Sequence, residues 1–222
     1  MHWIDPDYLP ETKGTFERFL VNRHGEADGM ILTDGTEVHF PPHLSSQMQA
    51  EIQRGTAVKV SVRGVRPRDS ELIAAVSIDF PNDARVLDEG PDKGRHQEPG
   101  KEHGKHGPKS KHSPMHASGI IRCVLHGPKG EARGVLLEDG TSVRFPHHEA
   151  PRLARFLVPG NTVAARGEGL TSSIATVIQA AQLGASLEDL VPIEHKGPER
   201  RKHFKHAKKA KNPNHSRDGH AA

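Results

Sequence analysis

The chain has a single cysteine, few aromatic residues and no long apolar run. The one thiol, Cys123, excludes an internal disulfide framework and a zinc site built from several thiolates. Every apolar stretch is shorter than the roughly 20 residues that span a bilayer, and the first residues lack the basic and apolar parts of a secretory signal. We therefore expect a soluble protein of the cytoplasm.

Composition places the 222 residues between globular and disordered chains. Hydrophobic residues make up 33% of the sequence and aromatic residues 4%, whereas Gly, Pro and His are abundant, with 22, 17 and 17 copies. Such a chain has too little apolar material for one large enzyme with an extensive core. We predict small folded units joined by solvated segments.

An internal duplication organises the foldable part of the sequence. Residues 14–80 align with residues 119–185 at an offset of 105 positions. Self-similarity at one fixed offset predicts two copies of one structural unit. The residues identical in the densest part of the match are Leu32, Asp34, Gly35, Thr36, Val38, Phe40, Pro41 and His43, which recur as Leu137, Asp139, Gly140, Thr141, Val143, Phe145, Pro146 and His148.

Charge is divided unevenly along the chain. Residues 1–87 carry 9 basic and 13 acidic side chains, and residues 119–193 carry 7 of each. Residues 88–118 hold five His and almost nothing apolar, which predicts a disordered, His-rich linker. Residues 194–222 hold nine Lys or Arg against three acids, a local charge of +6. Any attraction for polyanions therefore lies mainly in this basic tail.

Each copy shows the same order of expected strands. Alternating or β-branched apolar runs are bounded by Gly, Pro and Asp-Gly turns, as in short antiparallel strands. Asp34-Gly35 and Asp139-Gly140 predict tight type I′ hairpin turns. We expect strands at 16–21, 29–33, 37–40, 57–63 and 72–80, and in the second copy at 120–125, 134–138, 142–145, 162–166 and 175–183.

After the third strand the apolar period changes from two to about 3.6, which predicts one amphipathic helix per copy. Leu44, Met48 and Ile52 form its apolar face in the first copy. Ser46 and Gln49 have the spacing of a capping box, and Gly55 is expected to end the helix. In the second copy the corresponding residues are Pro151, Leu153, Phe156, Leu157 and Gly160.

Three strands, a helix and two strands within about 65 residues resemble the OB-fold, a five-stranded Greek-key barrel with a helix between its third and fourth strands. The resemblance rests on element order and turn chemistry, and no ligand-specific motif accompanies it. SH3-like barrels, the main alternative, lack an amphipathic helix of two turns or longer at that place. The expected fold class is mainly β, with OB-like barrels in residues 1–87, which include an N-terminal extension, and 119–193.

The duplicated motifs have structural interpretations. Asp34 and Asp139 suit a hairpin turn and need no catalytic role. His43 and His148 could ligate a metal or a phosphate, but no Cys, Asp or Glu accompanies them at a recognisable spacing, so we favour helix capping or packing. Phe40 and Phe145 follow the apolar phase of their strands and are expected in the cores.

No cofactor or dedicated metal site is expected. The pairs His103 with His106 and His203 with His206 could bind zinc, nickel or copper loosely. The sequence shows no nucleophile with its base, no phosphate-binding Gly loop and no carboxylate pair at a defined spacing, and we expect a protein that is not an enzyme.

Candidate nucleic-acid-binding residues come from the tail and from the loops and strands that the OB resemblance implicates. The barrels contribute few cations, and almost no aromatic side chain remains free to stack on bases. The candidates are Arg200, Arg201, Lys202, Lys205, Lys208, Lys209 and Lys211 in the tail, and Arg66, Arg68, Lys129, Arg133, Arg144 and Arg166 in the barrels.

These observations predict a non-enzymatic, bacterial-type adaptor that binds RNA or single-stranded DNA with low sequence specificity through its basic tail. Two alternatives remain open. The barrels could form a protein-interaction module through exposed strand edges or the acidic first copy, or the 17 His could buffer transition metals. A membrane surface is a poorer partner because the tail has one large apolar residue, Phe204.

Overall fold

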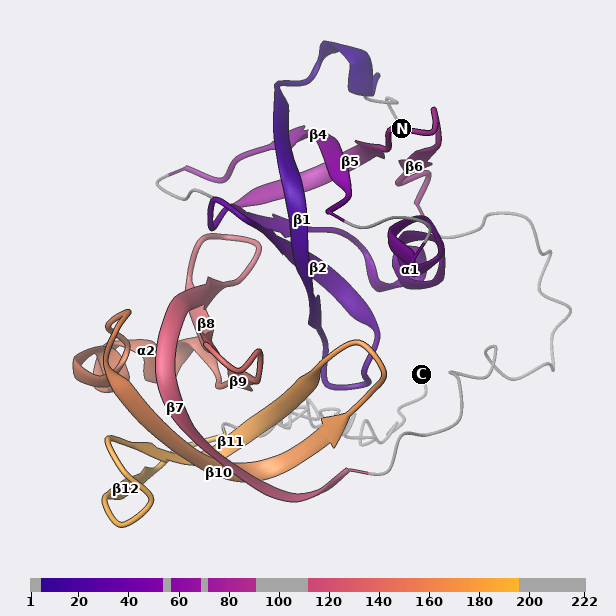
Figure 1. Cartoon of the computed structure of the whole chain (residues 1–222). Helices are drawn as coiled ribbons and strands as arrows, with labels where there is room; N and C mark the ends of the chain where they lie inside the picture. Colours follow the sequence, from indigo (N-terminus) through magenta and orange to yellow (C-terminus); the bar gives the residue numbers. More distant parts are fainter. Residues whose placement is uncertain (1–4, 54–56, 69–71, 91–111, 196–222) are drawn as a thin grey trace, which may run out of the picture.

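The computed structural model describes residues 5–53, 57–68, 72–90 and 112–195. These residues form two closed five-stranded β-barrels in tandem (Figure 1), which confirms the predicted mainly β fold class. In the described part of the chain, no helix has the length and apolarity needed to cross a membrane.

The first barrel has the strand order β3-β2-β1-β4-β5, and parallel pairing of β3 with β5 closes it. A sixth short strand, β6, pairs antiparallel with β5. A 3-10 turn, η1, precedes the barrel. The elements are η1 Pro6–Tyr8, β1 Glu11–Val21, β2 Ala27–Leu32, β3 Glu37–His39, η2 Pro42–Leu44, α1 Ser45–Gln53, β4 Lys59–Val65, β5 Ile73–Asp79 and β6 Arg85–Leu87.

The second barrel repeats this topology. Its strand order is β10-β7-β8-β9-β11, and pairing of β10 with β11 closes the barrel. The short strand β12 pairs antiparallel with β11, as β6 pairs with β5 in the first barrel. The elements are β7 Ser113–His126, β8 Ala132–Leu137, β9 Ser142–Arg144, η3 His147–Glu149, α2 Ala150–Leu153, η4 Ala154–Phe156, β10 Thr162–Thr171, β11 Thr176–Gly184 and β12 Leu190–Pro192.

Each barrel is filled by its own apolar cluster. Phe40 is buried among the strands of the first barrel with Val38 and Met48, and Phe145 occupies the equivalent place in the second barrel beside Val143. The two phenylalanines are 5% and 4% exposed. The expected core role of both is confirmed, which removes them as stacking platforms for bases.

The Asp-Gly turns differ from the predicted type I′ geometry. Gly35 and Gly140 have positive φ values of 89° and 91°, but neither preceding Asp does. The NH of Gly35 donates to Leu32 O, and the Asp34 carboxylate accepts from the NH of Thr36. The prediction of type I′ turns is therefore wrong, because the Asp side chain stabilises a three-residue connection in which the glycine alone is left-handed.

The helices also depart from expectation in detail. Helix α1 begins at Ser45, whose Oγ accepts hydrogen bonds from Gln49 Nε2 (3.0 Å) and from the NH of Ala27 (2.9 Å). Ser46, predicted to open a capping box before the helix, is instead the second residue of α1, which directly follows the 3-10 turn η2. In the second copy, two 3-10 turns shorten the helix to α2. Gly55, the expected end of the first helix, lies outside the described residues.

Strand β7 begins at Ser113, within the predicted linker of residues 88–118, rather than at the expected 120. Its polar first half pairs along β10, from Ser113 with Gly169 to Ile120 with Thr162. The local composition suggested a solvated segment, but cross-strand hydrogen bonds satisfy this backbone without requiring apolar side chains. Residues 91–111 lie outside the described residues.

Both fourth strands carry a β-bulge at an Arg-Gly pair, Arg63-Gly64 in β4 and Arg166-Gly167 in β10. A Cβ on Gly167 would overlap the carbonyl oxygen of Gln179 on the neighbouring strand, and Gly64 faces Ala74 O in the same way. The absence of a side chain allows this close approach of two backbones.

We predict that Gly167→Ala lowers the free energy of unfolding by about 2–3 kcal/mol, because overlap with a backbone oxygen cannot be relieved by rotating a side chain. Urea denaturation followed by circular dichroism measures the change. Gly119→Ala in β7 is the control, because a Cβ there would lie 3.4 Å from Leu137, an ordinary contact that should cost less than about 0.5 kcal/mol. Equal effects of the two variants would contradict this account.

Candidate functional site

The outer faces of the two β-hairpins, β1–β2 and β7–β8, pack against each other. Leu20 and Ile31 from the first barrel and Leu125 and Leu136 from the second form one cluster, each at most 1% exposed, with Cys123 beside it. Each leucine or isoleucine occupies the position 105 residues from its counterpart. Because equivalent positions meet, the junction has the self-complementary character of a two-fold interface.

Charged side chains border this apolar contact. Glu17 and Arg122, which are also equivalent positions, form an ion pair with each other. On another part of the junction, Arg144 Nη2 lies 3.1 Å from Asp28 Oδ1, with the Arg144 side chain 15% exposed. Both pairs join one barrel to the other. The pair with Asp28 holds the Arg144 side chain within the junction.

A buried carboxylate connects the barrels at the start of β3. Glu37, 6% exposed, accepts hydrogen bonds from the backbone NH of His126 (3.0 and 3.1 Å) and from His126 Nδ1 (3.0 Å) in the second barrel. His39 Nε2 of its own strand donates from 2.8 Å. The carboxylate therefore holds a main-chain group and a side chain of the other barrel at once.

Electrostatics stabilise the ionised form of this carboxylate. Burial alone would raise the pKa of Glu37, but hydrogen bonds from His126 and His39 outweigh burial and lower the pKa to about 2. The hydrogen bond to Glu37 also raises the pKa of His126 against the effect of its own burial. Glu37 and His126 thus form a charge-assisted pair between the barrels.

The β10–β11 hairpin reaches across to the first barrel (Figure 1). Ile174 at its tip packs against the first barrel's core cluster. A Cβ built on Gly25, in the β1–β2 turn, would lie 2.8 Å from Leu170 Cδ2 of β10. The hairpin and the apolar junction together make the two barrels one body.

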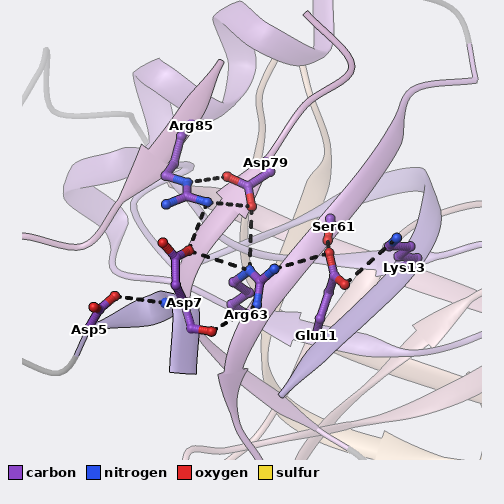
Figure 2. A network of polar contacts seen from close by, with 8 residues as sticks. All are labelled: Asp5, Asp7, Glu11, Lys13, Ser61, Arg63, Asp79 and Arg85. Atoms are coloured by element: carbon purple, nitrogen blue, oxygen red, sulfur yellow. Dashed lines mark hydrogen bonds and ion pairs between the residues drawn. The ribbon is translucent and has the colours of Figure 1, made fainter. Parts of the chain in front are cut away.

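A second polar network ties the N-terminal segment to the first barrel (Figure 2). Arg63 on β4 lies 3.6 Å from Glu11, 3.9 Å from Asp79 and 4.0 Å from Asp7. Arg85 bonds Asp79 and lies 3.1 Å from Asp7, and the hydrogen bond to Asp79 raises its pKa. Arg63 is surrounded by carboxylates and has a structural role.

The structure scatters the predicted nucleic-acid-binding cations of the barrels. Arg66 and Arg68 are exposed in the β4–β5 connection, Lys129 is exposed in the β7–β8 turn, and Arg133 lies 3.0 Å from Glu131. Arg166 is exposed on β10. The structure does not bring them together with Arg144 on one open face. The tail candidates Arg200 to Lys211 lie outside the described residues.

The histidines of the duplicated motif contact the segment that follows the last strand of their own barrel. His43 Nε2 lies 3.6 Å from Asp88, and His148 Nε2 donates to Glu194 O from 2.8 Å. Among the residues that the structure describes, no three His, Cys, Asp or Glu side chains are placed to hold a metal ion. The His pairs of the linker and tail lie outside that part.

Cys123 lies between the barrels and is half-buried. Burial is the main cause that raises the pKa of its thiol to about 11, and the negative charge of Glu37 adds to it. The thiolate is the nucleophilic form of cysteine, so this position disfavours reactivity.

Comparison of the sequence with protein-family models and with curated proteins, and of the fold with solved structures, gives no match. Functional inference therefore rests on the chain's own residues.

The sequence prediction missed the junction between the barrels, although a signal was present. Met30-Ile31-Leu32 and Val135-Leu136-Leu137 are continuous apolar runs without the alternation of a half-exposed strand. Such runs indicate strands buried on both faces. Glu37 had no comparable signal, because its partner His126 is 89 residues away in the chain.

We predict that Glu37→Gln destabilises the protein by about 3 kcal/mol near pH 6, since it leaves both histidine donors without their anionic partner. In the wild type the contribution of Glu37 is complete above its ordinary pKa of 4.5 and disappears as the pH falls towards the folded value of about 2. The contribution of His126, whose folded pKa is raised from 6.5, is complete below pH 6.5 and disappears as the pH rises through the folded value.

Thermal unfolding measured across pH tests this prediction. The wild type should lose stability between pH 4.5 and 2, and the Gln variant should lose markedly less over that range. Glu188→Gln, at an exposed carboxylate, is the control and should follow the wild type. Identical pH profiles of the wild type and Glu37→Gln would show that the Glu37 pair does not contribute.

Proposed function

We propose that this protein is a non-enzymatic nucleic-acid-binding protein of low sequence specificity, in which two OB-like barrels form one rigid body that carries a basic arm. The observation that supports this most is the concentration of charge. Residues 194–222 hold nine Lys or Arg against three acids, whereas residues 1–87 have a net charge of −4 and residues 119–193 of zero.

A basic segment of this density binds polyphosphates without recognising bases. Each Lys or Arg that neutralises a phosphate releases a condensed counterion, so affinity falls steeply with salt. RNA or single-stranded DNA is the proposed ligand because an unpaired strand can follow a cationic segment closely.

The packing of the barrels suggests that their sheet faces contribute less to nucleic-acid binding than the tail does. OB-folds bind oligonucleotides on the face of their second and third strands, with the loops between strands one and two and between strands four and five. In this protein β2 and β8 are buried on the outer face as well as the inner one, and the β10–β11 hairpin contacts the first barrel. The β2 and β8 faces that the OB resemblance would assign to a strand of nucleic acid are therefore covered by the neighbouring barrel.

Hydrogen bonds fix the last described residues, which lead into the tail, to the second barrel. His195 Nε2 donates to Ala180 O of β11 from 3.0 Å, and Arg152 Nη2 donates to Pro192 O from 2.5 Å. The basic residues that follow thus start from a fixed point on the second barrel. Binding by the tail brings any cation of that barrel to the same strand of nucleic acid at a high effective concentration.

We predict that deleting residues 196–222 weakens binding of single-stranded RNA by at least about tenfold and flattens the dependence of affinity on salt, because most phosphate contacts are lost. Fluorescence anisotropy with a labelled oligouridylate over a potassium chloride series measures both quantities. The deletion leaves the contacts of Glu194 and His195 in place, so the unfolding temperature should not change.

Unchanged affinity of the truncated protein would move the binding site to the barrels. Absence of binding by the full chain to both RNA and single-stranded DNA would overturn the proposed function. Capture of a protein partner that survives nuclease treatment would then favour the protein-interaction alternative.

A further inference from the structure

An arginine at an equivalent position has acidic neighbours in the first barrel and none among its cross-strand partners in the second. Arg63 and Arg166 both precede the bulge glycine of the fourth strand. In the first barrel, Arg63 pairs across the strands with Glu11, and in the second, Arg166 pairs at the same register with His116. The arginine is thus common to both copies, whereas the residue facing it has changed from an acid to a histidine.

Arg63 also contacts Asp79 in the sheet of the first barrel, and the second barrel has no carboxylate at the equivalent position. Asp79 of β5 corresponds to Gly184 of β11, because each pairs with the β4 or β10 residue two positions before the arginine. Arg85, which holds Asp79, corresponds to Leu190. Arg166 is exposed, and the residues that pair with it across the strands, His116 and Gln182, are not acidic.

The neighbours of Arg166 form a polar row across the sheet. His116 of β7 lies on one side of Arg166 and Gln182 of β11 on the other, and Gln182 is in turn paired with Pro192 of β12. His116 is exposed and Gln182 is partly exposed. Pro192, which lies beside the row, is two residues before the basic tail of residues 194–222.

We propose that this row, His116, Arg166 and Gln182, is the fixed part of the nucleic-acid-binding surface and contacts the phosphate backbone of a strand bound by the tail. The proposal rests on the proposed function and adds to it a defined place on the second barrel. A guanidinium without a carboxylate partner binds phosphate oxygens, and His and Gln side chains donate additional hydrogen bonds. The first barrel does not share this role because Glu11, Asp7 and Asp79 neutralise its arginine.

An exposed acid, Glu168, lies near the row. Glu168 follows Arg166 by two residues on β10 and pairs with Pro114 of β7. Its negative charge opposes a phosphate at the row. Removal of this charge is therefore expected to strengthen binding, whereas loss of Arg166 is expected to weaken it.

The test uses the full chain and a labelled oligouridylate, with affinity measured by fluorescence anisotropy over a potassium chloride series. His116→Glu reproduces in the second barrel the acid that faces Arg63 in the first. We expect about tenfold weaker binding, because the new carboxylate both neutralises Arg166 and repels phosphate. Arg166→Ala should weaken binding about fivefold and reduce the logarithmic salt slope by about 0.7, the value of one lost single-strand phosphate contact.

Three controls separate the row from general effects of charge and folding. Gln47→Glu adds an acid at an exposed position on α1 of the first barrel and should leave binding within about twofold, since that helix lies outside the row. His116→Gln should retain most of the affinity, and Glu168→Gln should increase it. Unfolding temperatures of all variants should match the wild type, because each changed side chain is on the surface.

The outcomes distinguish this inference from the proposed function. If the wild type binds through its tail but His116→Glu and Arg166→Ala bind equally well with an unchanged salt slope, the row is not a contact and the tail acts alone. If Gln47→Glu weakens binding as much as His116→Glu, net charge rather than position is responsible and the inference fails. If the wild type binds no nucleic acid, both the proposed function and the row are overturned.

Discussion

The apolar contact between the β1–β2 and β7–β8 hairpins is the constraint on which the rest of the structure depends. It buries the outer faces of strands whose inner faces already fill a barrel, so both hairpins are covered on two sides. Ion pairs surround this contact, and the Glu37 carboxylate fixes its register by holding His126 of the other barrel. Apolar area supplies most of the attraction, and the buried charge makes one arrangement preferable to others.

The duplication explains why this contact is possible. A surface that packs against a copy of itself must be self-complementary, and leucines or isoleucines at equivalent positions meet that requirement without any charge. Away from the junction the copies are free to diverge. The first barrel surrounds Arg63 with carboxylates, one of them Asp7 of the N-terminal segment, whereas the second leaves Arg166 exposed on β10. One fold thus carries two different charge environments at the same position.

Local rules of sequence were sufficient for the order of the five barrel strands and the helix of each copy, but not for their limits or for the added strands β6 and β12. Asp34 was correctly interpreted as a turn residue, yet its hydrogen bond to Thr36 selected another turn type. Helix α1 begins at Ser45 rather than after Ser46, and the Ser45 hydroxyl accepts a hydrogen bond from the NH of Ala27 in a neighbouring strand. Strand β7 extends into a polar segment because β10 lies beside it. For Ser45 and β7, a partner distant in the chain decided a boundary that local propensity left open.

The sequence by itself determined the two-copy architecture, the strand and helix order, the buried phenylalanines and the location of positive charge in the last residues, because periodicity, turn chemistry and composition are local properties. Only the tertiary structure decided which surfaces remain open. Arg144 and Arg166 look alike in the sequence, but one is engaged by Asp28 between the barrels and the other is exposed on β10. The environment of a charge depends on residues far away in the chain, and these become neighbours only when the barrels close and pack.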